Sequence, residues 1–188
     1  MGINTNEVNI NYYDNVIPFK VRHGISKMCL SSSFYLGWGD RATYENVVEN
    51  SSKSVPCLHS MWSEETINLS GILPYVENCI DQTPWFKYRN LHKVILNLTK
   101  SNDVHYLHVH HNEHAVLYYV NLDWEDGWYG ETLFYNPENL EKVVFTSLYK
   151  PGRMILFDGH IPHAIRPQSV IAPRYRMSLT LFFNDGNS

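Results

Sequence analysis

Histidines gather in one region of the 188-residue chain. Seven of the ten lie between His105 and His163, and five of these fall between His105 and His114. A carboxylate, Glu113, stands among them. Imidazole and carboxylate groups at strand ends are the ligands that iron, zinc and manganese take in proteins. We therefore interpret the chain as a metalloenzyme built on a β-scaffold.

The bulk properties suit one globular domain that spans residues 1–188. The hydrophobic fraction is 44%, and the formal net charge of −4 with no basic stripe argues against a nucleic-acid partner. No apolar run approaches the ~20 residues of a membrane span. The chain opens on a polar run without an export signal, and its three scattered cysteines form no disulfide framework. We expect a cytoplasmic protein.

The histidines need strands to hold them, and β-prone runs with turn residues between them dominate from residue 93 onward. After a strand-like run at residues 93–99, seven short strands are expected, at residues 104–110, 115–121, 131–135, 143–146, 153–157, 163–166 and 176–183. Before them, apolar residues recur at helical spacing from Ser60 to Ile80, with Ser63 as N-cap and Pro74 kinking or dividing the helix. This order predicts a mainly β protein with a jelly-roll core and supporting N-terminal helices.

The N-terminal part carries no recognisable chemistry. Residues 2–53 are polar and irregular, with β-prone pieces at Val16–Phe19 and Ser33–Leu36 and a turn at Gly37–Asp40. We expect residues 1–92 or so to contribute strands and helices that pack on the barrel. Residues 93–183 or so then form the catalytic core.

Four motifs follow one another in the C-terminal half. They are WEDGWYGETLF at residues 124–134, PGRMILFDG at 151–159, IPHAIRP at 161–167 and RMSL at 176–179. This ordered set resembles the iron(II)- and 2-oxoglutarate-dependent oxygenases of the prolyl-4-hydroxylase-like branch, over about residues 105–183. The resemblance implies a double-stranded β-helix, which agrees with the strand count. It also implies Fe(II) as metal, with 2-oxoglutarate and O2 as cosubstrates.

The resemblance assigns roles to residues of the last strands. His163 fits the distal iron ligand, and Arg176 with Ser178 fits the grip on the distal carboxylate of 2-oxoglutarate. Arginine suits that role because its planar fork matches a carboxylate with two hydrogen bonds. Tyr119 matches a position whose hydroxyl supports the same carboxylate. Arg174 is a neighbouring candidate, since residues 174, 176 and 178 of a strand share one face.

The proximal iron ligands can be taken in two ways. His111-Asn-Glu113 satisfies the His-x-carboxylate formula of the family, but Glu113 stands only two residues before the next strand. His108-Val-His110 stands at a better distance and places both side chains on one strand face, yet it replaces the carboxylate by a histidine. A mixed set, in which Glu113 folds back beside His108 or His110, is a third arrangement. The residues leave these alternatives open.

Three functions compete. The resemblance implies an oxygenase that hydroxylates a C–H bond of a peptide, an amino-acid side chain or a small molecule. The run His108-x-His110-x-x-Glu113 also approximates the metal motif of a cupin-like metalloprotein, although that reading leaves Arg176 unused. The third alternative is a non-catalytic metal-binding jelly-roll protein.

Overall fold

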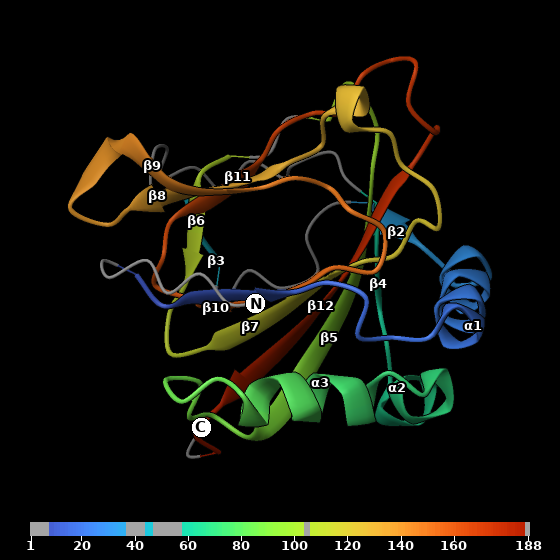
Figure 1. The fold of residues 1–188 in the computed structure, drawn as a ribbon, viewed down its shortest axis with the longest axis horizontal. Coiled ribbons are helices and arrows are strands. Elements are labelled where there is room, and N and C mark those ends of the chain that lie inside the picture. The colour runs from blue at the N-terminus through green and yellow to red at the C-terminus, as the bar shows by residue number, and fades with distance from the viewer. Residues whose placement is uncertain (1–7, 37–43, 47–57, 104–105, 187–188) are drawn as a thin grey trace.

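The computed structural model describes residues 8–36, 44–46, 58–103 and 106–186. Two antiparallel sheets form its core (Figure 1). In spatial order, the seven-stranded sheet contains β1 (Ile10–Tyr13), β10 (Met154–Asp158), β7 (His114–Tyr119), β12 (Arg176–Asn184), β5 (Asn90–Thr99), β4 (Leu58–Met61) and β2 (Tyr35–Leu36). The five-stranded sheet contains β3 (Tyr44–Asn46), β6 (His108–His110), β11 (His163–Ile165), β8 (Thr132–Asn136) and β9 (Asn139–Ser147).

From β5 to β8, and again from β9 to β12, the chain passes from one sheet to the other with every strand. This alternation is the double-stranded β-helix, so the predicted fold class is confirmed. All seven strands expected after residue 103 are present: β6, β7 and β11 are shorter than expected, β9 and β12 are longer, and β8 and β10 are shifted by one residue. The strand-like run at residues 93–99 is the main part of β5.

The central strands of the seven-stranded sheet, β10, β7 and β12, are buried on both faces, as β12 illustrates. Its nine residues are all buried. Met177, Leu179 and Leu181 belong to the apolar cluster that also contains the helices, whereas Phe182 belongs to the cluster between the two sheets. Because side chains alternate along a strand, Arg176 shares the face of Phe182 and is turned into the barrel.

Helices cover the outer face of this sheet. They are α1 (Phe19–Leu30), α2 (Glu64–Ser70) and α3 (Leu73–Asp81), and a 3-10 turn, η1, spans Asp126–Trp128. The Ser63 hydroxyl caps α2 by accepting from the Thr66 N–H at 3.2 Å. Gly71 ends α2 with φ of 68°, a conformation that glycine adopts without strain. The expected helix is thus divided, at Gly71, and Pro74 lies in the first turn of α3, where a proline is tolerated.

The N-terminal expectations were partly wrong. The piece at Val16–Phe19 is not a strand: Pro18 precedes α1, which begins at Phe19. The first strand of the described residues is instead β1, which pairs with β10. The other β-prone piece, Ser33–Leu36, contains the strand β2. The turn at Gly37–Asp40 lies outside the described residues.

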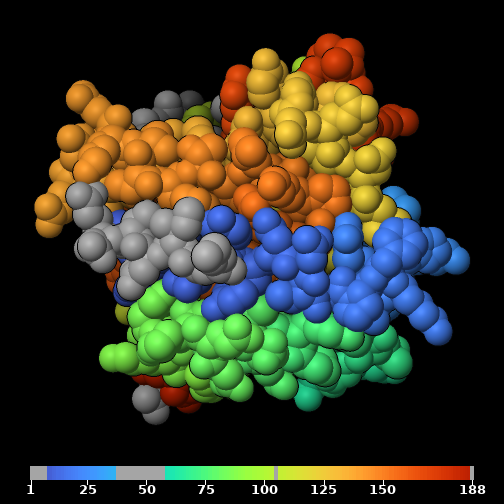
Figure 2. Space-filling model, viewed as in Figure 1, coloured from blue at the N-terminus to red at the C-terminus, as the bar shows by residue number. Residues whose placement is uncertain are grey.

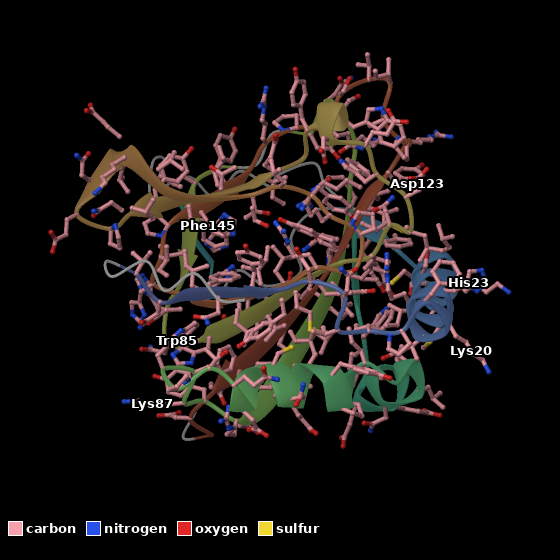
Figure 3. The ribbon with its side chains drawn as sticks, viewed as in Figure 1. Lys20, His23, Trp85, Lys87, Asp123 and Phe145 are labelled. Atoms are coloured by element: carbon pink, nitrogen blue, oxygen red, sulfur yellow. The ribbon has the colours of Figure 1, made fainter. Side chains whose placement is uncertain are left out.

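The sequence pattern did not predict helix α1, because this helix buries few residues. Only Ile25, Ser26 and Cys29 of its twelve residues are buried, so its apolar stripe is narrow. Lys20 and His23 project from it to the outside (Figure 3). On the face shown in Figure 2, the N-terminal residues (blue) lie between those of α2 and α3 (green) and those of β8 and β9 (orange). Within the described ranges, no helix is long and apolar enough to cross a membrane.

Candidate metal centre

Three buried histidines meet inside the barrel. His108 on β6 and His163 on β11 are paired across two antiparallel strands, and His110 follows two residues after His108 on the same strand face. One ring nitrogen from each of the three lies within 4.8 Å of the others. Their exposed fractions are only 4–6%. Ring nitrogens gathered this closely could hold a single metal ion.

Backbone carbonyls orient two of the rings. The Nδ1 of His108 lies 2.9 Å from the Tyr106 carbonyl oxygen, and the Nδ1 of His163 lies 2.9 Å from the Ile161 carbonyl oxygen. A carbonyl can only accept, so each Nδ1 donates its proton and each Nε2 keeps a free lone pair. This tautomer is the one that metal-binding histidines commonly adopt.

Burial keeps the three imidazoles neutral. It lowers the pKa of His108 to about 4, and the hydrogen bond to Tyr106 only partly opposes this. Burial also holds the pKa of His110 and that of His163 well below the usual value, with His108 adding to both effects. A neutral imidazole offers its lone pair to a metal without releasing a proton first. The donor set therefore fits a first-row metal ion such as iron(II).

The chain turns sharply after β6, and this turn decides where the proximal candidates go. Asn112 adopts φ of 60°, a left-handed conformation that asparagine tolerates better than most residues. His111 is exposed and packs on the ring of His160, 5.2 Å away. Glu113 folds back beside His110, with 3.8 Å between its Oε2 and the Nδ1 of His110. The structure thus brings His108 and His110 to His163 and leaves His111 outside.

The remaining histidines of the region lie elsewhere. His114 is buried among the rings of Trp85, Phe86 and Tyr88, and its ring is 4.3 Å from that of Tyr88. His160 is exposed and contacts the carboxylate of Asp158. His105 lies outside the described residues.

Arg176 is fully buried at the start of β12. Its Nε donates to the Gly130 carbonyl at 2.8 Å, whereas its terminal nitrogens reach only the hydroxyls of Ser178 and Thr132, at 3.4 and 3.3 Å. No carboxylate of the described residues forms an ion pair with it. A buried guanidinium without a counter-charge is costly, so an anionic ligand is the partner that its surroundings lack.

Two tyrosines complete the surroundings of Arg176. The guanidinium lies 5.2 Å from the ring of Tyr119 and 4.9 Å from that of Tyr149, and the two rings stack at 4.3 Å. The Tyr119 hydroxyl donates to Thr132 at 2.8 Å. Tyr119 and Ser178 therefore both lie beside Arg176. Tyr149 was missed because nothing in its sequence neighbourhood distinguishes it, whereas Thr132 could have been found from the Gly-Glu-Thr motif.

Arg174 is not brought to this group. It is exposed, precedes β12, stacks on Tyr175 at 5.3 Å and lines a surface hollow together with Lys100. The expected face-sharing with Arg176 fails because the chain becomes a strand only at residue 176.

A cavity between the sheets joins the two halves of the site. The three histidines line it together with Thr132 and Ser178, the hydroxyl partners of Arg176. One polar side chain of β5 also lines it: Asn97 Oδ1 is buried and has no hydrogen-bond partner in the described part of the chain. Buried polar atoms without partners are rare, so a polar ligand between the sheets accounts for this one.

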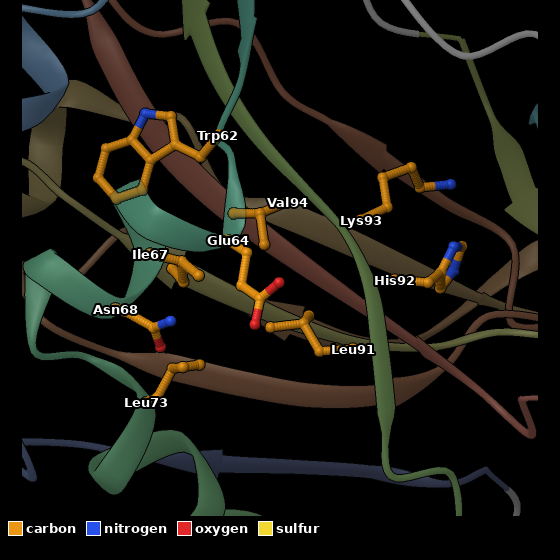
Figure 4. Close-up of a pocket in the computed structure, with 9 residues that line it drawn as sticks. All are labelled: Trp62, Glu64, Ile67, Asn68, Leu73, Leu91, His92, Lys93 and Val94. Atoms are coloured by element: carbon orange, nitrogen blue, oxygen red, sulfur yellow. The ribbon is translucent and has the colours of Figure 1, made fainter.

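A second hollow, of about 350 Å³, lies between α2 and the first half of β5 (Figure 4). It is lined by Trp62, Glu64, Ile67, Asn68, Leu73, Leu91, His92, Lys93 and Val94. None of the three clustered histidines borders it.

Solved structures share this fold. A Trichoplax adhaerens prolyl hydroxylase, in complex with a hypoxia inducible factor peptide fragment, matches with a TM-score of 0.68 and 19% identity over 96% of this chain and 85% of that one. A Pseudomonas putida prolyl-4-hydroxylase matches with a TM-score of 0.67 and 14% identity over 95% and 94%. The 2OG complex of a viral collagen prolyl hydroxylase from Paramecium Bursaria Chlorella virus-1 matches with a TM-score of 0.62 and 12% identity over 95% and 98%.

No protein-family model and no curated protein sequence matches the chain. At identities of 12–19%, the structural matches establish the fold. The chain therefore has the double-stranded β-helix fold of the 2OG-Fe(II) oxygenases, and prolyl hydroxylases are among the proteins most like it in structure.

Proposed function

We propose that this chain is an iron(II)- and 2-oxoglutarate-dependent oxygenase that hydroxylates a C–H bond of a peptide, an amino-acid side chain or a small molecule. One observation carries the proposal. Three buried neutral histidines line the same cavity as the hydroxyl partners of Arg176, a buried cation with no carboxylate partner in the described ranges. A metal ion and an anionic cosubstrate, bound side by side, account for both features.

The three histidines would hold the metal through Nε2, with His108 and His163 kept in place by their backbone contacts. Iron(II) bound there would supply oxygen activation coupled to the oxidation of 2-oxoglutarate. Three imidazoles contribute no negative charge. The charge that balances a divalent ion must then come from the bound cosubstrate and from acidic groups nearby.

Arg176 would bind the distal carboxylate of 2-oxoglutarate with its two terminal nitrogens. Their present contacts to Thr132 and Ser178, at 3.3 and 3.4 Å, are longer than a good N–H···O bond of about 2.9 Å. A carboxylate offers a shorter, charge-assisted and bidentate alternative. Tyr119 would help to hold the guanidinium in place, because its ring lies 5.2 Å from the guanidinium and its hydroxyl donates to Thr132.

Apolar side chains would exclude water from the reacting atoms. Ile95, Leu117, Phe157 and Phe182 line the cavity beside the histidines, and all four are buried. A water-poor cavity strengthens the polar contacts made inside it and protects reactive groups from side reactions.

The substrate class is proposed from two observations. A structure that shares the fold holds a peptide fragment, which makes peptides the first substrates to test. The net charge of −4 gives no support to a nucleic-acid substrate. The cupin-like alternative gives Arg176 no role, so the buried guanidinium favours the oxygenase.

The cysteines support a cytoplasmic location. Cys29 and Cys79 are free and buried. Burial raises the pKa of Cys29 to about 12 and that of Cys79 to about 11, so both stay as unreactive thiols. Free thiols in a small domain are typical of a reducing compartment.

The experiment measures succinate. Protein reconstituted anaerobically with iron(II) should release succinate from 2-oxoglutarate once oxygen is admitted, and release should stop when iron, oxygen or 2-oxoglutarate is left out. Peptide and small-molecule panels would then be screened for faster release. In parallel, 2-oxoglutarate should change the visible spectrum of the cobalt(II)-loaded protein. No succinate above background, together with an unchanged spectrum, would refute the proposal.

A further inference from the structure

Glu113 is buried beside the metal centre, with an exposed fraction of 2%. The turn after β6 carries it there, and Gly159 fixes both sides of the turn. The Gly159 carbonyl accepts from the His110 N–H at 2.7 Å, and the Gly159 N–H donates to the Glu113 carbonyl at 2.9 Å. A carboxylate buried this deeply needs partners that compensate its charge.

Two donors occupy one of its oxygens. Lys93 Nζ and His92 Nε2 each lie 2.8 Å from Oε1 of Glu113. Both residues come from β5, and Figure 4 shows their side chains directed away from Glu64 on α2. Lys93 is itself buried, with its Nζ 4.3 Å from the centre of the Phe182 ring. These contacts balance the charge of Glu113 and hold its carboxylate in one orientation.

The other oxygen faces His110. Oε2 of Glu113 and Nδ1 of His110 are both buried, and neither has a hydrogen-bond partner in the described ranges. They lie 3.8 Å apart. A charge-assisted hydrogen bond spans about 2.8 Å, so a shift of about 1 Å would close it. One acceptor and one donor, adjacent and both lacking a partner, define a single missing bond.

His110 is also the exception among the three histidines. His108 and His163 each give their Nδ1 proton to a backbone carbonyl, two residues earlier in the chain. Nδ1 of His110 meets no carbonyl of the described residues, and it lies 3.8 Å from Oε2 of Glu113. Its orientation and tautomer therefore depend on a side chain.

We propose that Glu113 is a positioning residue of the metal centre, whose Oε2 accepts the Nδ1 proton of His110 while the Nε2 of His110 binds the metal. The inference rests on the proposed function in one respect only, namely that the three histidines hold a metal ion. In this arrangement the Glu113 carboxylate does not bind the metal itself but contacts it through the ring of His110. It makes His110 a more basic ligand and adds negative charge near an otherwise neutral donor set.

The test compares two variants in which no buried lysine is left unpaired. Lys93→Met alone keeps the Glu113 carboxylate, whereas Glu113→Leu with Lys93→Met removes it and leaves an apolar pair. Metal affinity is measured by anaerobic titration with cobalt(II), followed through its visible bands. Lys93→Met should weaken binding only a few-fold, because His92 Nε2 still lies 2.8 Å from Oε1 of Glu113. The double variant should bind cobalt(II) 10- to 100-fold more weakly than Lys93→Met, the usual cost of losing the hydrogen-bond partner of a metal-binding histidine.

Glu113→Gln with Lys93→Met separates the hydrogen bond from the charge, since an amide oxygen still accepts a hydrogen bond but carries no charge. Its affinity should fall between those of the other two variants, an order that a merely structural role would not produce. It also carries the comparison if circular dichroism shows that the leucine variant is unfolded. A control, Asp14→Asn, removes the charge of the half-exposed partner of Arg153, 2.6 Å from its Nε, and should leave cobalt affinity unchanged.

Nitrogen NMR of the zinc-loaded protein gives an independent readout. The wild type should show His110 bound through Nε2, with a slowly exchanging proton on Nδ1. That proton should exchange faster in the leucine double variant. Binding of His110 through Nδ1 would overturn the proposal.

Two further results would overturn it. One is equal cobalt affinity in Lys93→Met and the leucine double variant, when the wild type binds cobalt. The other is a change of coordination number in the visible bands of the double variant, which would make Glu113 a ligand itself. A wild type that binds no metal would strike the proposed function first, and the inference with it.

Discussion

His108 and His163 face each other directly across β6 and β11, with their ring centres 4.2 Å apart. This pairing does most to build the centre. Residues opposite one another in an antiparallel ladder bring their side chains to the same face, and the residue two positions on joins them. His110 is that residue. Three candidate ligands therefore come from two short strands, whose register in the five-stranded sheet sets their spacing.

Removing one ligand should abolish tight metal binding. His108→Ala or His163→Ala should weaken cobalt(II) affinity more than about 100-fold, because a direct ligand contributes more than its outer partner. His111→Ala is the matched control, since this ring is exposed and contacts His160 rather than the centre. Anaerobic titration measures all three. A collapse of affinity in His111→Ala would restore the register of His111 with Glu113.

Arg176 should determine the affinity for 2-oxoglutarate. Arg176→Ala should weaken binding by about 2–4 kcal/mol, roughly 30- to 1000-fold, because the cosubstrate carboxylate is left buried without its partner. Metal affinity should stay within about threefold. Arg174→Ala is the control, since Arg174 is exposed and lies outside β12. Titration of 2-oxoglutarate into the cobalt-loaded protein measures both. Equal losses in the two variants would show that Arg176 has no special role.

The metal-free protein should lose stability as the pH falls from 6.5 toward 4. An unfolded histidine has a pKa of about 6.5, whereas burial lowers the pKa of His108 to about 4 and those of His110 and His163 well below the usual value. In this window the unfolded chain binds protons that the native chain refuses. Stability is thus fully present above pH 6.5, and each histidine removes about 1.4 kcal/mol per pH unit below it.

Urea unfolding at several pH values between 7.5 and 4.5 measures this slope. His163→Gln should reduce it by about 1.4 kcal/mol per pH unit, because one proton fewer is taken up on unfolding. The difference between the variant and the wild type isolates the histidine from the carboxylates that titrate in acid. Parallel stability curves for the two proteins would contradict the prediction.

The C-terminal strands could be predicted because their residues follow the pleat. In β12, the polar residues Arg176, Ser178 and Thr180 alternate with the apolar residues Met177, Leu179 and Leu181, which sets one face of the strand apart. The proximal ligands could not be decided in this way. Their arrangement depends on Asn112 taking a left-handed conformation, which turns His111 outward and Glu113 back toward His110. A pattern of residue types does not encode one backbone angle.

The sequence did not predict strand β1, helix α1 or the place of Tyr149, for a related reason. The strand β1 and the helix α1 are stabilised by partners distant in sequence, as in the pairing of Ile10 with Phe157. Tyr149 reaches the site in the same way, by stacking on Tyr119. Such contacts exist only in the folded chain, so local composition does not announce them.

Gly159 should tolerate no side chain. A Cβ there would overlap the backbone carbonyl oxygens of His110 and Glu113, and the two hydrogen bonds of Gly159 to these residues would break. Backbone cannot move aside as a side chain can, so we expect Gly159→Ala to cost about 2–4 kcal/mol of stability. It should also weaken cobalt(II) binding, because the same turn holds His110. Gly24→Ala in α1 meets nothing within 4 Å and should leave both unchanged or slightly raise stability. Urea unfolding with cobalt titration compares the two alanine variants, and equal behaviour would show that the turn does not support the centre.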